Sequence, residues 1–259
     1  MKIDSPTFLS ETTFISASVQ FSSGSQKFGN TSDDTHQFTG SLSISGSRID
    51  FNDGKFNTFV GFDTGKSITT GGYNSLFGYQ AGHDTTTASG SVFIGSSAGY
   101  DVTTGNQNIA IGLSALNSSG TTGDNNIAIG AYSADAISTG ANNIAIGTWA
   151  YTIATGGSEQ VVIGYEAGRN HQGSYSVFLG HQAGRATTGG SGANGSYNVA
   201  IGYQSLYSQR TTARYLTVIG SQAGYNIKDN SEQSVIVGYQ SGQYATGSYN
   251  TFVGSKAGR

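Results

Sequence analysis

Few of the residues that usually carry chemistry stand at spacings that would let them act together. The 4 histidines are His36, His83, His171 and His181, and none has a partner at the spacing of a metal site. His171 and His181 would come close only if they lay on successive turns of a repeat. Since the chain has no cysteine, thiolate ligands and disulfides are excluded. The sequence therefore predicts no metal site and no cofactor.

Two glycine motifs match nucleotide-binding loops by letter only. Residues 61–67 read Gly-Phe-Asp-Thr-Gly-Lys-Ser, with three residues between the glycines where a phosphate-binding loop has four, and no helix signal follows. Residues 190–195 satisfy the dinucleotide pattern, but no βαβ unit surrounds them. We interpret both segments as turns and expect no nucleotide at either.

Paired carboxylates on a repetitive surface would point to the cleavage of polysaccharides. The acidic residues are sparse and stand at unlike positions of the repeat described below, as for Asp101, Asp124, Asp135, Glu159 and Glu166. No serine is set between a strand and a helix in the manner of a hydrolase nucleophile. We expect no catalytic residue and no enzyme, and a carboxylate pair across neighbouring repeats stays open as an alternative.

The charge of the chain excludes several kinds of partner. The formal net charge is −3 and charged residues make up only 10% of the chain, against roughly a quarter in an average domain. Because the Lys and Arg residues are scattered, we expect no nucleic acid, and no apolar run is long enough to cross a membrane. Residues 1–6 lack the apolar core of a signal peptide, which favours assembly in a cytoplasm over secretion.

The dominant feature is a repeat that any site must be built upon. An apolar residue followed by glycine, the anchor glycine, recurs at steps of 16 to 18 residues with one step of 22. Alternation closed by glycine indicates strands, and a fixed short period indicates stacked coils. The sequence predicts an all-β parallel solenoid of about twelve coils of roughly 17 residues. The anchors are Gly61, Gly78, Gly95, Gly112, Gly130, Gly147, Gly164, Gly180, Gly202, Gly220, Gly238 and Gly254.

Residues at the same position relative to the anchor glycine form a row along the coil. Each row is numbered by that position, negative before the anchor and positive after it. The branched or aromatic residues of row −1, from Val60 to Val253, are expected to fill the core, and the small residues of row +3 a tight inward corner. Row −2 then faces outward, and this apolar stripe needs cover from other copies of the chain. The alternative places row −2 against a second layer inside a wide coil. The candidate oligomer interface is Phe59, Leu76, Phe93, Ala110, Ala128, Ala145, Val162, Phe178, Ala200, Val218, Ile236 and Phe252.

Asparagine recurs in row −4 of seven coils. At a turn, stacked Asn side chains can hydrogen-bond one another and the nearby backbone, as in an Asn ladder. We assign no other chemistry to this row. Its members are Asn57, Asn74, Asn108, Asn126, Asn143, Asn198 and Asn250.

The strings Asn-Ile-Ala-Ile-Gly at 108–112, 126–130 and 143–147, and Asn-Val-Ala-Ile-Gly at 198–202, resemble the head repeat of YadA-type trimeric autotransporter adhesins. The resemblance covers residues 57–259. It implies a left-handed parallel β-roll with two short strands per turn, assembled side by side as a homotrimer. The copies are longer than the family's usual repeat and often end in Ala-Gly, which resembles the versions found in bacteriophage tail fibres.

Residues 1–50 carry no copy of the repeat, and short alternating runs there, such as 15–21, indicate β-rich structure. Residues 28–42 resemble a segment of phage fibre shafts. We therefore expect an N-terminal shaft or connector over 1–50 and a β-roll repeat domain over 51–259.

These patterns favour a non-enzymatic virion structural protein, a trimeric tail fibre that serves host attachment. Its partners would be other copies of the chain, other tail proteins and host surface glycans. One alternative is the head of a bacterial adhesin at the cell surface, and another is a polysaccharide-degrading fibre. Sugar rings could stack on exposed tyrosines, although the same rings could simply pack on neighbouring coils. The candidate surface-binding residues are Tyr73, Tyr175, Tyr197, Tyr249 and, in the 22-residue step, Arg185.

Overall fold

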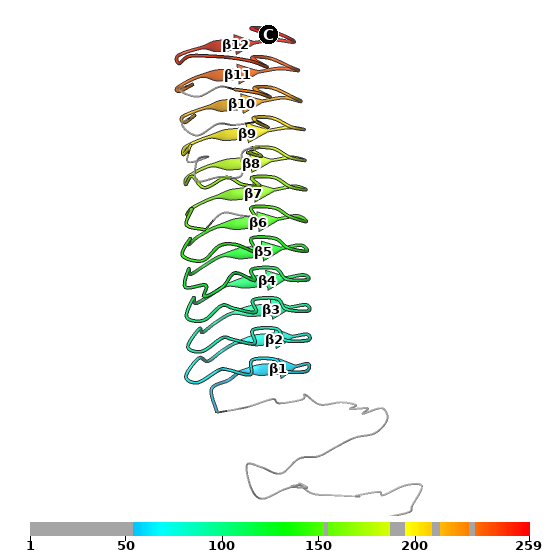
Figure 1. The fold of residues 1–259 in the computed structure, drawn as a ribbon, viewed down its shortest axis with the longest axis vertical. Helices are drawn as coiled ribbons and strands as arrows, with labels where there is room; N and C mark the ends of the chain where they lie inside the picture. The colour runs from blue at the N-terminus through cyan, green and yellow to red at the C-terminus, as the bar shows by residue number, and fades with distance from the viewer. Residues whose placement is uncertain (1–53, 153–154, 187–194, 209–212, 228–230) are drawn as a thin grey trace, which may run out of the picture. The chain divides into compact units, whose positions relative to one another are not determined.

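The computed structural model describes residues 54–152, 155–186, 195–208, 213–227 and 231–259. The chain divides into two units, Met1–Ile49 and Asp50–Arg259. The first unit, with the shaft segment expected there, lies outside the described residues, as does most of the glycine-rich loop at 190–195. The second unit is a stack of coils (Figure 1).

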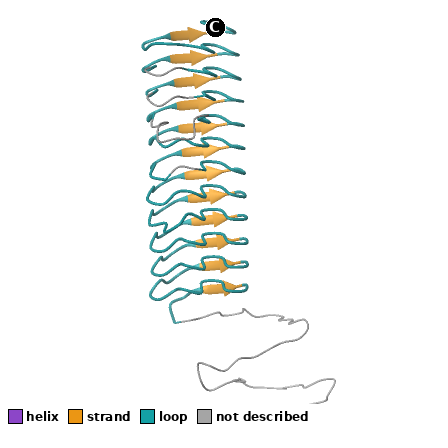
Figure 2. Cartoon of the chain, viewed as in Figure 1, coloured by secondary structure: helices purple, strands orange, loops and turns teal. Residues whose placement is uncertain are grey.

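The described residues contain twelve strands of three residues each, joined into one parallel sheet in chain order (Figure 2). Equivalent repeat positions pair throughout, as in Thr58↔Ser75 and Ile109↔Ile127, whether the step is 17 or 18 residues. The predicted β-solenoid is confirmed. The strands are β1 (Thr58–Val60), β2 (Ser75–Phe77), β3 (Val92–Ile94), β4 (Ile109–Ile111), β5 (Ile127–Ile129), β6 (Ile144–Ile146), β7 (Val161–Ile163), β8 (Val177–Leu179), β9 (Val199–Ile201), β10 (Thr217–Ile219), β11 (Val235–Val237) and β12 (Thr251–Val253).

In the described part of the chain each coil has one strand, where the resemblance implied two. The return side of the coil is held by single backbone bonds between successive turns, such as Gly65 N to Ala81 O at 3.0 Å and Gly82 N to Ala98 O at 2.9 Å. Residues on that side take left-handed backbone angles, as Gln80 does with φ 54°. Such angles break the extended conformation that a second strand would need.

The expected orientation of the strands is wrong, because row −2 faces into the coil and row −1 faces out. The candidate oligomer interface is therefore the interior of the single chain. Leu76, Phe93, Ala110, Ala128, Ala145, Val162, Phe178, Ala200, Val218 and Ile236 have no exposed surface, and Phe59 and Phe252, in the first and last coils, are partly buried against them. Row −1 is partly exposed, for example 40% at Ile94 and 38% at Ile163.

The inward orientation of row −2 agrees with a size relation between row −2 and row +4. Where row −2 carries a large side chain, row +4 is glycine, and a Cβ at Gly65 would lie 2.7 Å from Cε1 of Phe59. Where row −2 is alanine, row +4 supplies a side chain instead, and each of these is buried: Leu116, Ala134, Tyr151 and Leu206. The two rows share one interior space, although one coil has alanine in both, at Ala128 and Ala134.

Two other expectations about the interior are confirmed. The small residues of row +3 are buried, as at Ala81 and Ala98. The Asn row forms a ladder, in which Asn57 Oδ1 accepts the Asn74 backbone N–H at 2.9 Å and Asn108 Oδ1 accepts that of Asn126 at 2.8 Å. The Asn side-chain amides donate to backbone carbonyls of the adjacent turn, as Asn74 Nδ2 does to Ala88 O at 2.9 Å. The ladder satisfies buried polar groups that would otherwise be costly.

Candidate functional site

The outer face of the sheet is an apolar surface that runs over all twelve strands of the described residues. It is formed by rows −1 and −3, because alternate residues of a strand share a face. Every residue of row −1 is apolar, and eight of row −3 are Val or Ile, from Val92 to Val235. So large a continuous apolar surface is unusual on a monomeric protein. We therefore still expect an oligomer, but because rows −1 and −3 are apolar and exposed, not because of row −2.

The predicted tyrosines of row −5 stack on one another along the coil. The rings of Tyr175 and Tyr197 lie 5.0 Å apart and 6° from parallel, and Tyr197 and Tyr215 lie 5.0 Å and 7° apart. Both faces of the Tyr197 ring are thus covered by neighbouring rings. Tyr73 stacks on Phe56 at 5.2 Å, and Tyr249 is 79% exposed. Since a sugar ring stacks on an aromatic face, only rings with an open face can act as platforms.

A second aromatic row, next to the anchor glycines, crosses five coils. It runs through Tyr132, Trp149, Tyr165, His181 and Tyr203, with ring centroids 5.0 to 6.4 Å apart. The recurrence of tyrosine directly after the anchor, at Tyr165 and Tyr203, is visible in the sequence, whereas Tyr132 and Trp149 stand one position later. His181 therefore belongs to the outer surface.

His171 is fully buried inside the coil, with its ring edge-on to Phe178 at 4.7 Å. The two histidines are thus not brought together. Burial lowers the pKa of His171 to about 3, so this imidazole is neutral at physiological pH.

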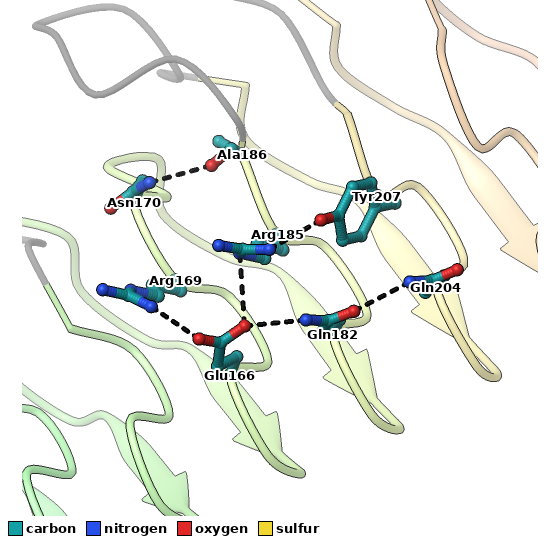
Figure 3. Close-up of polar contacts among 8 residues, drawn as sticks. All are labelled: Glu166, Arg169, Asn170, Gln182, Arg185, Ala186, Gln204 and Tyr207. Atoms are coloured by element: carbon teal, nitrogen blue, oxygen red, sulfur yellow. Dashed lines mark hydrogen bonds and ion pairs between the residues drawn. The ribbon is translucent and has the colours of Figure 1, made fainter.

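Figure 3 shows a polar cluster centred on Glu166, the residue that follows Tyr165 of the aromatic row in the chain. Glu166 Oε1 accepts from Arg169 Nη1 at 2.5 Å, and Oε2 accepts from Gln182 Nε2 at 2.7 Å, with Arg185 Nε 3.5 Å away. Burial acts to raise the pKa of Glu166, but the hydrogen bond from Gln182 and the charges of Arg185 and Arg169 outweigh it and lower the pKa. The carboxylate is therefore held ionised.

The cluster links several coils rather than presenting a free cation. Arg185 Nη1 donates to the Tyr207 hydroxyl at 2.6 Å, so the predicted binding residue Arg185 bridges two coils. Gln204 Nε2 donates to Gln182 Oε1 at 2.8 Å, and the amide ladder continues in the same sense through Gln222 and Gln240 at 3.2 and 2.9 Å. An ionised carboxylate can only accept hydrogen bonds. Glu166 therefore requires Gln182 to donate to it, and each later amide then donates to the amide oxygen of the coil before it.

One carboxylate pair does form across neighbouring coils, at Asp84 and Asp101. The two side chains share a hydrogen bond, and His83 Nδ1 lies 2.7 Å from Asp84 Oδ1. Burial and the hydrogen bond with Asp84 raise the pKa of Asp101. For Asp84, burial acts to raise the pKa, but the bonds to His83 and Asp101 outweigh it and lower it. Glycosidase carboxylates stand about 5 Å or more apart to admit the substrate, so a directly bonded pair does not match that arrangement.

Comparison of the chain with protein-family models, with curated proteins and with solved structures finds no match. Among the described residues, no helix is long and apolar enough to span a membrane. In the same part of the chain, no group of three or more His, Asp or Glu side chains is placed to hold a metal ion. The fold and surface define a β-solenoid protein whose main outer features are an apolar sheet face, stacked rings and polar ladders.

Proposed function

We propose that the chain is a non-enzymatic structural segment of a homotrimeric fibre, a left-handed β-roll preceded by a shaft segment, in the tail of a bacteriophage, where it serves host attachment. The observation that carries the proposal is the apolar outer face of the sheet, rows −1 and −3, which a single chain leaves open. Burying apolar surface is the main driving force for stable association.

The repetition of this face favours a second copy of the chain as its partner. The side chains recur at every coil, about 4.8 Å apart, so a partner must present the same spacing over the same length. Another copy does so in every coil. The resemblance to trimeric adhesin heads supports three chains packed side by side around a common axis.

The remaining surface suits attachment better than catalysis. Outside the sheet face it carries stacked rings, amide ladders and hydroxyl groups, as at Tyr175, Tyr197, Gln182 and Gln204. Such groups fit host glycans, and the bonded pair of Asp84 and Asp101 lacks the spacing of a glycosidase. The head of a bacterial surface adhesin, whose repeat the sequence resembles, is the second candidate; detection of the chain in purified virions or in cell envelopes distinguishes the two.

Light scattering tests the assembly. The purified chain is expected at three times its mass of 26.7 kDa. Ile129→Asp places a charge on the outer face and is expected to give folded monomers, because the buried charge opposes association while the coil interior is untouched. Asn125→Asp, an exposed change in the same coil, should leave the trimer intact. A wild-type chain that stays monomeric at micromolar concentration would overturn the proposal.

A further inference from the structure

Gly90 interrupts a row of side chains, although its backbone conformation does not require glycine. Row −5 holds left-handed backbone angles in every coil, and eleven non-glycine residues there, including Tyr73 and Gln107, have φ between 50° and 65°. Gly90 has φ 69°, so other side chains tolerate its conformation. The nearest atom to a Cβ built there is Gln107 Cγ at 3.4 Å, an ordinary contact. The missing side chain therefore leaves a gap in the row.

The gap is an open recess with an aromatic floor. Its volume is about 510 Å³, and its lining residues are Tyr73, Ser89, Gly90, Asn106 and Gln107. Tyr73 is 69% exposed as a residue, and one face of its ring stacks on Phe56 at 5.2 Å and 12°. Gln107 lies two coil steps beyond Tyr73, about 10 Å. That separation leaves space for one ring between Tyr73 and Gln107, where other coils of the row have a stacked side chain.

We propose that this recess binds one neutral pyranose ring of a polysaccharide, lying on the open face of Tyr73. The C–H face of a pyranose packs on an aromatic ring while its hydroxyls seek polar partners. This assignment rests on the proposed role in host attachment and gives that role a site and a ligand class.

The polar groups around the recess are held in place to meet those hydroxyls. Ser89 Oγ accepts from Gly72 N at 3.1 Å, and Asn106 Oδ1 accepts from Ser89 N at 3.0 Å. The side chain of Gln107 is exposed, so its amide can turn toward a ligand. A few fixed polar groups beside an apolar platform are typical of small-ligand sites.

The recess itself carries no charge. None of its five lining residues is charged, and the flanking charges have opposite signs: Asp124 Oδ1 accepts from the Asn106 backbone N–H at 2.6 Å, and Lys55 lines the adjoining recess. A sugar carboxylate would therefore find no cation within the recess to pair with. A second recess of about 320 Å³ shares Tyr73 and Ser89 and continues past Phe56, which allows a neighbouring sugar of the same polymer to stay bound.

Titration with simple sugars tests the assignment. Methyl glycosides of glucose, galactose, mannose and N-acetylglucosamine, and of glucuronate as the acidic probe, are added to the full chain and followed by saturation-transfer NMR. At least one neutral glycoside is expected to bind, and the glucuronate not. Gly90→Tyr should stack on Tyr73 as Tyr197 does on Tyr175 and abolish binding, whereas Tyr73→Ala should weaken it about tenfold or more.

Two variants in the same row serve as controls. Tyr215→Ala removes a ring that stacks on Tyr197 and contacts Arg214, and Gln233→Tyr adds a ring elsewhere in the row; both should bind as the wild type does. Binding that survives Gly90→Tyr, or no neutral glycoside bound at millimolar concentration, overturns the proposal. Light scattering of the same samples and adsorption to host cells report separately on the fibre role, so a trimer that adsorbs after Gly90→Tyr retains that role without this site.

Discussion

A Cβ atom at Gly99 would lie 2.6 Å from Cδ2 of Phe93, so the phenyl ring occupies the space that any side chain at residue 99 would need. One coil further on, the relation is inverted: Ala110 stands where Phe93 stood, and Leu116 replaces the glycine. Both Ala110 and Leu116 are fully buried. In each of these two coils one large side chain fills the interior, and it comes from a different row.

A swap within one coil tests this volume relation. Ala110→Phe overpacks the interior and is expected to cost about 1–3 kcal/mol, and Leu116→Gly leaves a cavity and costs about 3 kcal/mol or more. The double variant recreates the Phe93 and Gly99 arrangement, so its loss should be smaller than the sum of the single losses by at least about 1 kcal/mol. Urea unfolding of the four proteins measures the coupling. Additive losses would contradict a shared space.

Adjacent residues on one strand should respond to charge in opposite ways. Ala128 is fully buried inside the coil and Ile129 lies on the outer face. Ala128→Asp is expected to unfold the central coils, because an unpaired charge cannot be desolvated there, whereas Ile129→Asp should dissociate the oligomer and keep the coil. Circular dichroism and light scattering together separate the outcomes. Dissociation without unfolding for Ala128→Asp would mean that row −2 faces the partner after all.

Acid should destabilise the coil through His171. Burial lowers its pKa to about 3 from the usual 6.5, so between these values the unfolded chain binds a proton that the folded chain does not. Stability is therefore lost as the pH falls through this window, by up to about 1.4 kcal/mol per unit. His171→Val, which matches Val102 at the same repeat position, should remove this slope. Unfolding midpoints at about pH 7 and about pH 5 measure it, and equal losses in both proteins would contradict the assignment.

Replacing Glu166 tests the end of the amide ladder. Glu166→Gln keeps the bond from Gln182 but leaves Arg169 and Arg185 without their carboxylate. Because both guanidinium groups are partly exposed, the expected loss at neutral pH is about 1 kcal/mol. The folded pKa of Glu166 is lowered, so its contribution is present above the usual value of 4.5 and disappears as the pH falls through the folded pKa. Glu159→Gln, on an exposed row, should have no such effect in the same urea titration.

The sequence predicted the period, the Asn ladder and the small inward corner because each repeats one residue type in a fixed place. Which face of each strand points into the coil was not predictable from the alternation of residues, because alternation separates two faces without indicating which one is inside. Row −1 is uniformly apolar, yet it lies on the outside. The signal that was available is the reciprocal size of residues six apart, such as Phe93 and Gly99.

The candidate sites were likewise predictable from the sequence only in part. Aligning anchors places Glu166, Gln182 and Gln204 in one row, and Gly90 in the row of Tyr73. Residue spacing does not predict side-chain orientation. It therefore could not show that Arg169 and Arg185 point toward one carboxylate, or that one face of the Tyr73 ring is open.

The strands lie across the axis of the coil, so the backbone hydrogen bonds between coils point along it (Figure 1). A tensile load along that axis would stretch the few bonds of one interface at a time instead of shearing many at once. Each coil that opened would release about 17 residues and lengthen the segment by about 50 Å. Such a rod would yield stepwise under a pull, absorbing work as it extends, and neighbouring coils would keep their own contacts.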